Sequence, residues 1–189
     1  MSLDADIKAA AEVLGKGGVI LYPTDTIWGL GCDATNQKAV EKVYRIKERV
    51  QDKSLIILVS DIVMLGKYVI EIPETAEELI ASVSEPITII YPAGRNLPKN
   101  VLASDGSIAV RIPRHQFCQD LLREFGKPIT STSANLSGTP NPYSFSGVVE
   151  PVKEAADFIV SVAHQSLSRP KPSTIVRIDK NGEIQVLRN

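Results

Sequence analysis

The sequence predicts a single α/β domain with a mixed β-sheet, and three observations support this fold class. Short apolar runs with the length of strands alternate with amphipathic helical segments early in the chain. The Asn181-Gly182 pair is a strong hairpin signal, which adds antiparallel pairing near the end. The chain has 189 residues, and one domain usually takes about 100–200.

Apolar periodicity and the residues that interrupt it define the elements in order. Apolar residues at helical spacing open the chain, and glycines end this segment before a β-preferring run closed by Pro23. Asn36 is suited to cap a second helix, and residues 55–59 are continuously apolar, which is typical of a strand covered on both faces. In chain order, the prediction is a helix over 4–14, a strand over 19–22, a loop over 23–31, a helix over 36–48, a strand over 55–59, helices over 61–69 and 73–82, a strand over 87–91, a loop over 92–99, a strand over 108–112, a helix over 117–125, a short extended segment over 128–132, a loop over 133–146, and strands over 158–162, 174–178 and 184–187.

Composition excludes several classes of protein. Hydrophobic residues make up 43% and charged residues 23%, which is ordinary for a globular protein. The formal net charge of −1 argues against a protein that coats nucleic acid by bulk charge, although it leaves a local basic patch open. Cys32 and Cys118 lack metal-site or disulfide-scaffold spacing. An acidic N-terminus and the absence of a long apolar run predict a cytoplasmic protein with no membrane segment.

The familiar catalytic motifs are absent. His115 and His164 are the two histidines, and their contexts favour surface or helix-cap positions. Residues 15–18 are rich in glycine but lack the spacing of a phosphate-binding loop, so a plain turn is the better interpretation. Covalent and redox catalysis therefore have little support in the sequence.

Loops rich in hydroxyl groups and cations stand out instead. They are Thr24-Asp25-Thr26 followed by Gly29 and Gly31, Lys47 and Arg49 with Lys53 beyond, Arg111 at a strand end, the Ser/Thr/Asn-rich residues 131–138, and Ser173 with Arg188. Each has a structural alternative, such as a turn or a cation at a helix C-terminus, and Lys47 continues the buried stripe of its helix. Together they describe a site for a charged, hydroxylated ligand, most simply a nucleotide.

The order of these motifs resembles that of the YrdC-like family of L-threonylcarbamoyladenylate synthases. The matching pieces are GVILYPTDTIWGLG over residues 18–31, Lys47-x-Arg49, IAVRIP over residues 108–113, Ser133-Ala134-Asn135 with Ser137-Gly138, and residues 173–176. The resemblance runs from about Gly17 to Arg188. It implies one domain over residues 1–189, in which a twisted open mixed β-sheet flanked by helices surrounds a concave, positively charged cavity.

The resemblance also implies an activity. L-Threonine, bicarbonate and ATP would give threonylcarbamoyl-AMP and pyrophosphate, and Mg²⁺ would arrive with ATP. A separate tRNA threonylcarbamoyl-transfer complex would then place the group on adenosine next to the anticodon, as N6-threonylcarbamoyladenosine. Direct contact with tRNA or double-stranded RNA is a further possible partner interaction.

Roles carry over to this sequence position by position. The residues implied to bind threonine are Thr26, Arg111, Ser131 and Ser173. The residues implied to bind the nucleotide are Arg49, Lys53, Ser107, Ser133, Asn135, Asn141 and Arg188. Lys47 and Arg49 form the implied catalytic pair, with Lys47 facing a phosphate or carboxylate, and no protein-held metal is implied.

The sequence departs from the family pattern at several positions. Trp28 replaces a usual tyrosine, Lys53-Ser54 replaces a frequent Asn-Pro, and Leu58 stands where some members have a threonine-contacting histidine. Glu85-Pro86 replaces a usual Gly-Pro.

Two other functions remain as alternatives. One is an RNA-binding module without catalysis, which the near-neutral charge and few aromatic residues disfavour. The other is a carbamoyl-adenylate enzyme of another pathway, because similar domains occur in hydrogenase-maturation proteins. Adenylation by positioning and charge neutralisation fits a chain without a catalytic histidine or cysteine motif.

Overall fold

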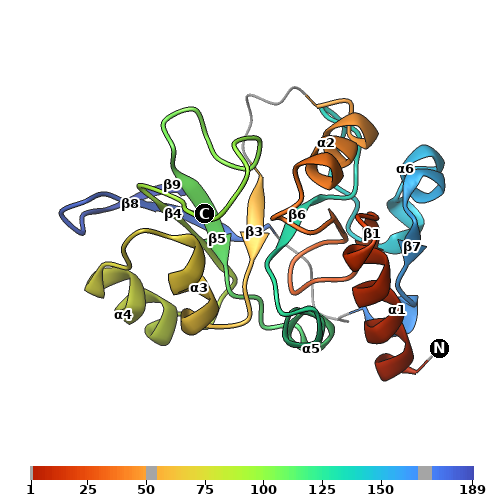
Figure 1. The fold of residues 1–189 in the computed structure, drawn as a ribbon, viewed down its shortest axis with the longest axis horizontal. Coiled ribbons are helices and arrows are strands. Elements are labelled where there is room, and N and C mark those ends of the chain that lie inside the picture. Colours follow the sequence, from red (N-terminus) through yellow and green to blue (C-terminus); the bar gives the residue numbers. More distant parts are fainter. Residues whose placement is uncertain (1, 50–54, 166–171) are drawn as a thin grey trace.

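Nine strands form one mixed sheet in the described residues of the computed structural model, which are 2–49, 55–165 and 172–189 (Figure 1). The strand order is β7-β1-β2-β6-β3-β5-β4-β8-β9. Three neighbouring pairs are parallel, namely β1/β7, β3/β5 and β4/β8, and the other pairs are antiparallel. The predicted α/β fold class with a mixed sheet is confirmed.

The elements follow one another along the chain with short connections. The strands are β1 Ile20–Tyr22, β2 Gly29–Gly31, β3 Ile56–Leu58, β4 Ile87–Tyr91, β5 Ile108–Arg111, β6 Ile129–Ser133, β7 Phe158–Ile159, β8 Thr174–Ile178 and β9 Ile184–Arg188. The helices are α1 Leu3–Gly15, α2 Gln37–Ile46, α3 Ile62–Tyr68, α4 Glu74–Ser82, α5 Gln116–Phe125 and α6 Glu150–Ala155, with short 3₁₀ turns η1 Phe145–Gly147 and η2 Val162–His164. Within the described ranges, no helix has the length and apolarity needed to cross a bilayer.

Helices cover both sides of the central strands, which divides the interior into two hydrophobic clusters. In β1, Leu21 packs in the cluster that includes α2, whereas its neighbours Ile20 and Tyr22 pack with α1 and α5. In β3, Ile57 and Leu58 divide in the same way. Successive strand residues point to opposite faces, so an apolar run is required when both faces are buried. The two-sided cover predicted for residues 55–59 is therefore confirmed at Ile57 and Leu58, whereas Leu55 and Ile56 also line the cavity described below.

Strand β2 corrects the predicted loop over residues 23–31. Gly29 pairs directly with Tyr22, whose aromatic ring covers it, and a Cβ there would lie 3.3 Å from the ring. A Cβ at Gly31 would overlap the carbonyl oxygen of Thr130 in β6. The glycines permit a close approach of three strands here, and this approach depends on residues far away in the sequence.

Three other differences concern elements that were not predicted and the ends of elements that were. The sequence prediction contains neither α6 nor the turn η1. The predicted strand over 158–162 shortens to β7 and is followed by η2. Helix α2 ends at Ile46 instead of Glu48, because the chain then turns sharply toward the cavity described below.

Candidate active site

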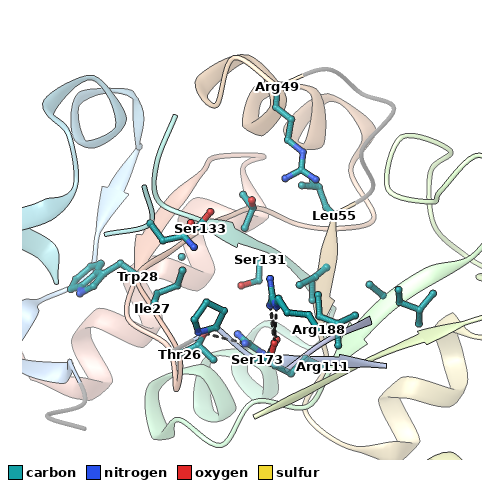
Figure 2. A pocket seen from close by; sticks show the side chains of 18 residues that line it. Thr26, Ile27, Trp28, Arg49, Leu55, Arg111, Ser131, Ser133, Ser173 and Arg188 are labelled. Carbon is teal, nitrogen blue, oxygen red and sulfur yellow. Dashed lines mark hydrogen bonds between the residues drawn. The ribbon is translucent and has the colours of Figure 1, made fainter. Parts of the chain in front are cut away.

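A cavity of about 310 Å³ opens over the middle of the sheet (Figure 2). Its floor is a row of directly paired residues, Ser131, Ile56, Ala109 and Ile90, across β6, β3, β5 and β4. The residues between them, such as Val110, point into the hydrophobic core. The alternation of strand residues thus forms a core on one face and a cavity floor on the other.

Most of the sequence-predicted site residues line this cavity. They are Thr26, Arg49, Arg111, Ser131, Ser133, Asn141, Ser173 and Arg188. None of the described lining residues is acidic. Figure 2 shows Arg49 at one end of the cavity and the other two arginines close together at the opposite end. The cavity therefore offers positive charge and hydroxyl groups at two separate places.

Arg111 ends β5 and is only 5% exposed. Its Nη1 donates to the hydroxyl of Thr26 at 3.0 Å, and that hydroxyl lies 2.9 Å from the hydroxyl of Thr24. Leu58 pairs directly with Arg111 in the neighbouring strand and is fully buried, so this neighbour is apolar. The Thr24–Thr26 turn therefore supplies the polar contacts to Arg111 that Leu58 on β3 does not.

Arg188 reaches the cavity because of an irregularity in the β8/β9 ladder. Val186 pairs with Val176, but the next pair joins Arg188 to Ile175, so Leu187 is an extra residue in β9. This bulge turns Arg188 toward the face on which Ile175 lines the cavity.

Ser173 holds the guanidinium of Arg188 in place. Nε and Nη2 of Arg188 donate to the Ser173 carbonyl oxygen at 3.1 and 2.8 Å. The Ser173 hydroxyl in turn lies 2.8 Å from the Thr88 hydroxyl. Burial and the positive charge of Arg111 lower the pKa of Arg188. The two guanidinium groups are therefore close enough to repel each other.

Lys47 does not line the cavity, which corrects the expectation that it faces a ligand. It is 2% exposed, and its ammonium donates to the Ser133 carbonyl, to the Asn135 carbonyl at 2.7 Å and to Asn135 Oδ1 at 3.1 Å. The Lys47 carbonyl also accepts from Ser137 N at 2.9 Å. Burial, and then the charge of Arg49, lower the pKa of Lys47 to about 8. Lys47 therefore attaches the loop after β6 to the end of α2.

Asn135 also helps to hold the loop after β6, and like Lys47 it does not line the cavity. Its Oδ1 accepts from the Ser133 hydroxyl at 2.5 Å, and its Nδ2 donates to the Thr139 carbonyl at 2.6 Å. These contacts fix the Ser133 side chain, which does line the cavity.

A strained residue separates Lys47 from Arg49. Glu48 has φ of 49°, in the left-handed region that favours glycine. Arg49 N donates to Tyr44 O at 3.0 Å and Glu48 N to Arg45 O at 3.1 Å, the bonding pattern of a Schellman helix end. The turn directs Lys47 into the protein and Arg49 toward the cavity.

The remaining predicted residues lie elsewhere. Ser107 lines a neighbouring cavity of about 190 Å³ that shares Ile90 with the main one and also contains Arg177 and Lys180. Lys53 and Ser54 fall outside the described residues. The nucleotide contact expected of Ser107 stays a prediction, and it requires a ligand that spans both cavities.

Neither histidine lines the cavity. His164 ends η2, where its Nε2 lies 2.9 Å from Oδ2 of the buried Asp6. His115 occupies the N-cap position of α5 without a capping side-chain bond, and burial lowers its pKa. The N-cap position is one of the two positions expected for His115, although its side chain does not cap the helix. Across the described ranges, no group of three or more potential metal-ligating side chains occurs.

Sequence reasoning missed the apolar walls of the cavity. Trp28 lines it, donates from Nε1 to Gln165 Oε1 at 2.7 Å, and packs with its ring centroid 4.9 Å from that of Phe145. Ile56, Ile90 and other apolar residues complete the lining. The signal for Ile56 and Ile90 in the sequence is their alternate position in predicted strands, which does not tell a cavity face from a core face, whereas Trp28 lies in the predicted loop and stands out only as a departure from the family pattern.

A cavity lined by three arginines over a mixed sheet is suited to small molecules with anionic groups. Residues 12–189 match the Sua5/YciO/YrdC family model, described as "Telomere recombination", and the chain belongs to this family. It is 44% identical over 141 residues to a threonylcarbamoyl-AMP synthase of Pseudoalteromonas translucida, covering 73% of this chain and 75% of the relative. A protein of the same name from Xanthomonas campestris is 33% identical over 182 residues, covering 95% and 96%.

The fold is also found in a solved structure of a family member. P. abyssi Sua5 complexed with L-threonine superimposes with a TM-score of 0.87 at 30% identity. The match covers 96% of this chain but 53% of that chain, so this protein spans about half the length of the archaeal protein.

Proposed function

We propose that this protein is a threonylcarbamoyl-AMP synthase, which joins L-threonine, bicarbonate and ATP and releases pyrophosphate. The observation that carries the proposal is the cavity with guanidinium groups at both ends and no acidic residue in its described lining. Such a site suits two substrates that each carry an anionic group, the threonine carboxylate and the ATP phosphates, and that must meet within one cavity. The names of the similar synthases and the threonine-bound relative support this choice of substrates.

In this proposal, threonine binds at the end of the cavity that holds Arg111. The guanidinium pairs with the threonine carboxylate, because the two neighbouring cations Arg111 and Arg188 carry more positive charge than the single carboxylate of Asp25 balances. The hydroxyls of Thr26, Ser131 and Ser173 surround the same end and provide hydrogen bonds.

MgATP binds toward Arg49, with Ser133 and Asn141 beside it. Arg188, next to the threonine end, lies where the α-phosphate meets the second substrate. Lys47 and Asn135 act as positioning residues, since they hold the loop that presents Ser133. Magnesium enters as part of the MgATP substrate.

The reaction needs positioning and charge neutralisation rather than a protein nucleophile. Bicarbonate gives carbon dioxide and hydroxide, the neutral threonine amine adds to the carbon dioxide and loses a proton, and this proton and the hydroxide leave as water, which gives a carbamate. A carbamate oxygen then attacks the α-phosphorus of ATP, the bond to the bridging oxygen of the β-phosphate breaks, and pyrophosphate leaves. Arginine side chains that face both anions stabilise the charge that builds up on the phosphate oxygens.

Pyrophosphate release is the direct test. ATP is supplied with threonine and bicarbonate, and each of the two is then omitted in turn. We expect release only in the complete mixture. Release that does not depend on threonine would overturn the proposal and favour a carbamoyl-adenylate enzyme of another pathway, and RNA binding without turnover would favour an RNA-binding module.

Replacement of Arg111 separates the two substrates. Arg111→Ala should raise the apparent threonine KM far more than the ATP KM, by about 2–5 kcal/mol of lost binding for a broken buried charge pair. Equal effects on both substrates would show that Arg111 does not bind threonine. Delivery of the product to tRNA, through a transfer complex or by direct RNA contact, belongs to the same proposal and is tested by formation of N6-threonylcarbamoyladenosine in a reconstituted system.

A further inference from the structure

Asp25 is an acidic residue beside Arg111 that the proposed mechanism leaves without a role. It lies between the two threonines of the Thr24–Thr26 turn, and its side chain is 10% exposed. It does not line the cavity, so a bound substrate does not meet its carboxylate. Its Oδ1 lies 3.6 Å from Nη2 of Arg111, which forms an ion pair behind the cavity wall.

A backbone contact fixes the Asp25 carboxylate on its other side. Oδ2 accepts a hydrogen bond from Arg114 N at 2.9 Å, just beyond the end of β5. Arg111 belongs to the same strand end, so the carboxylate is attached to the segment that carries the guanidinium. Asp25 thereby keeps a fixed position relative to Arg111.

The Arg111 guanidinium is consequently held at two nitrogens. Nη1 donates to the Thr26 hydroxyl at 3.0 Å, and Nη2 faces Asp25. Nε has no hydrogen-bond partner among the described residues, although it is buried. Asp25 Oδ1 makes no hydrogen bond with the described residues, so Thr26 holds one nitrogen by a hydrogen bond and Asp25 attracts the other by its charge.

The charge of Asp25 also opposes a repulsion. Arg188 lies close enough for the charge of Arg111 to lower its pKa, and no described residue lining the cavity carries a negative charge. Without the carboxylate, the Arg111 guanidinium would gain by moving away from Arg188. With it, both guanidinium groups stay at the same end of the cavity.

We infer that Asp25 is a positioning residue that aligns Arg111 for the carboxylate of the amino-acid substrate. The inference rests on the proposed function, because it takes the partner of Arg111 to be threonine. Thr26 binds one nitrogen of the guanidinium by a hydrogen bond and Asp25 attracts the other by its charge, so the turn favours the orientation in which Arg111 meets the substrate.

Asp25→Asn tests the inference because it keeps an oxygen for Arg114 N, removes the charge and places an amide NH2 instead of an oxygen opposite Arg111. We expect the apparent threonine KM to rise 10- to 100-fold, while kcat and the ATP KM stay within about twofold. A general electrostatic role predicts the opposite sign, because loss of a negative charge would tighten the binding of both anionic substrates. A purely structural role predicts that both KM values rise together with a lower melting temperature.

A double variant shows whether Asp25 acts through Arg111. In an Arg111→Ala background, Asp25→Asn should change the threonine KM by less than twofold, because the group that it positions is gone. An undiminished effect in that background would overturn the inference.

Asp33→Asn is the matched control. It removes a buried carboxylate that pairs with Lys127 at 3.0 Å and does not line the cavity, so the threonine KM should not change. The wild-type protein supplies the last comparison: pyrophosphate release without a need for threonine would refute the proposed function, whereas threonine-dependent release with an unchanged KM in Asp25→Asn would refute only the role of Asp25.

Discussion

Lys47→Met separates a support role for the lysine from a chemical one. Methionine keeps most of the apolar stem and removes the ammonium, which leaves the Ser133 and Asn135 carbonyls without this donor. Loss of a donor from buried acceptors costs about 1–3 kcal/mol each, so about 2–6 kcal/mol in total.

A second contribution to the free energy of unfolding has the opposite sign. Burial lowers the pKa of Lys47 from 10.5 to about 8, which means that the charged lysine itself costs the folded state about 3 kcal/mol at neutral pH. Methionine removes that cost. We therefore expect the unfolding free energy of Lys47→Met to lie between about 1 kcal/mol above and about 3 kcal/mol below that of the wild type, although the loop that Lys47 holds loses its attachment.

The activity of the variant should fall much more than its stability. Displacement of the Ser133 loop should lower kcat/KM for ATP by about 10- to 100-fold and leave the threonine KM within about twofold. Pyrophosphate release at varied ATP and varied threonine measures both. A fall in kcat of more than about 10⁴-fold with unchanged KM values would refute the support role and place Lys47 in the chemical step.

The lowered pKa of Lys47 also predicts a pH dependence of stability. Between about pH 8 and 10.5 the unfolded chain binds a proton at Lys47 that the folded protein has lost. The unfolding free energy of the wild type should then rise with pH relative to Lys47→Met, by at most about 1.4 kcal/mol per pH unit. Urea unfolding of both proteins at several pH values measures this difference, and a constant difference across the window would contradict the lowered pKa.

Three further predictions follow from the backbone. Glu48→Gly should raise the unfolding free energy by about 0.5–1 kcal/mol in urea titrations, because glycine adopts φ of 49° without strain; a loss of stability would contradict this. Gly31→Ala should lower the unfolding free energy by about 2–4 kcal/mol and the melting temperature by about 5–15 °C, because the new Cβ meets the Thr130 carbonyl. An unchanged melting temperature would show that β6 moves away from the new methyl group at little cost. Deletion of Leu187 should keep kcat/KM within about threefold, because the arginine would then directly follow Val186 and still pair with Ile175. An alanine inserted after Leu187 should instead lower kcat/KM to the level of Arg188→Ala. Equal effects of the deletion and the insertion would argue against the bulge.

The sequence was sufficient to predict the parts of the fold that depend on local periodicity. The apolar stripe of α2 includes Val40, Val43 and Tyr44, and Lys47 does continue it into the interior. The same periodicity could not show what the Lys47 ammonium contacts. Its acceptors lie at Ser133 and Asn135, and their approach depends on how β6 emerges beside the end of α2.

Elements that depend on distant residues were not predictable in this way. Gly29–Gly31 has the composition of a loop, since glycine alone has little preference for a strand. It becomes β2 because Tyr22 covers Gly29 and the Thr130 backbone approaches Gly31. Strand formation here is thus a property of three strands together, and no window of the sequence contains all of them.

The candidate site shows the same division between residue type and residue orientation. Hydroxyl and cationic residues at strand ends pointed correctly to the cavity, because strand ends gather at one place in a sheet. Orientation is another matter: alternation along β9 puts Arg188 on the same face as Ile184 and Val186, away from the cavity. The extra residue Leu187 shifts the alternation by one position, so Arg188 lies on the opposite face and its guanidinium turns toward Ser173. A one-residue irregularity in an edge hairpin therefore determines whether the third arginine of the cavity is present at all, and such an irregularity is visible only when the two strands are seen paired.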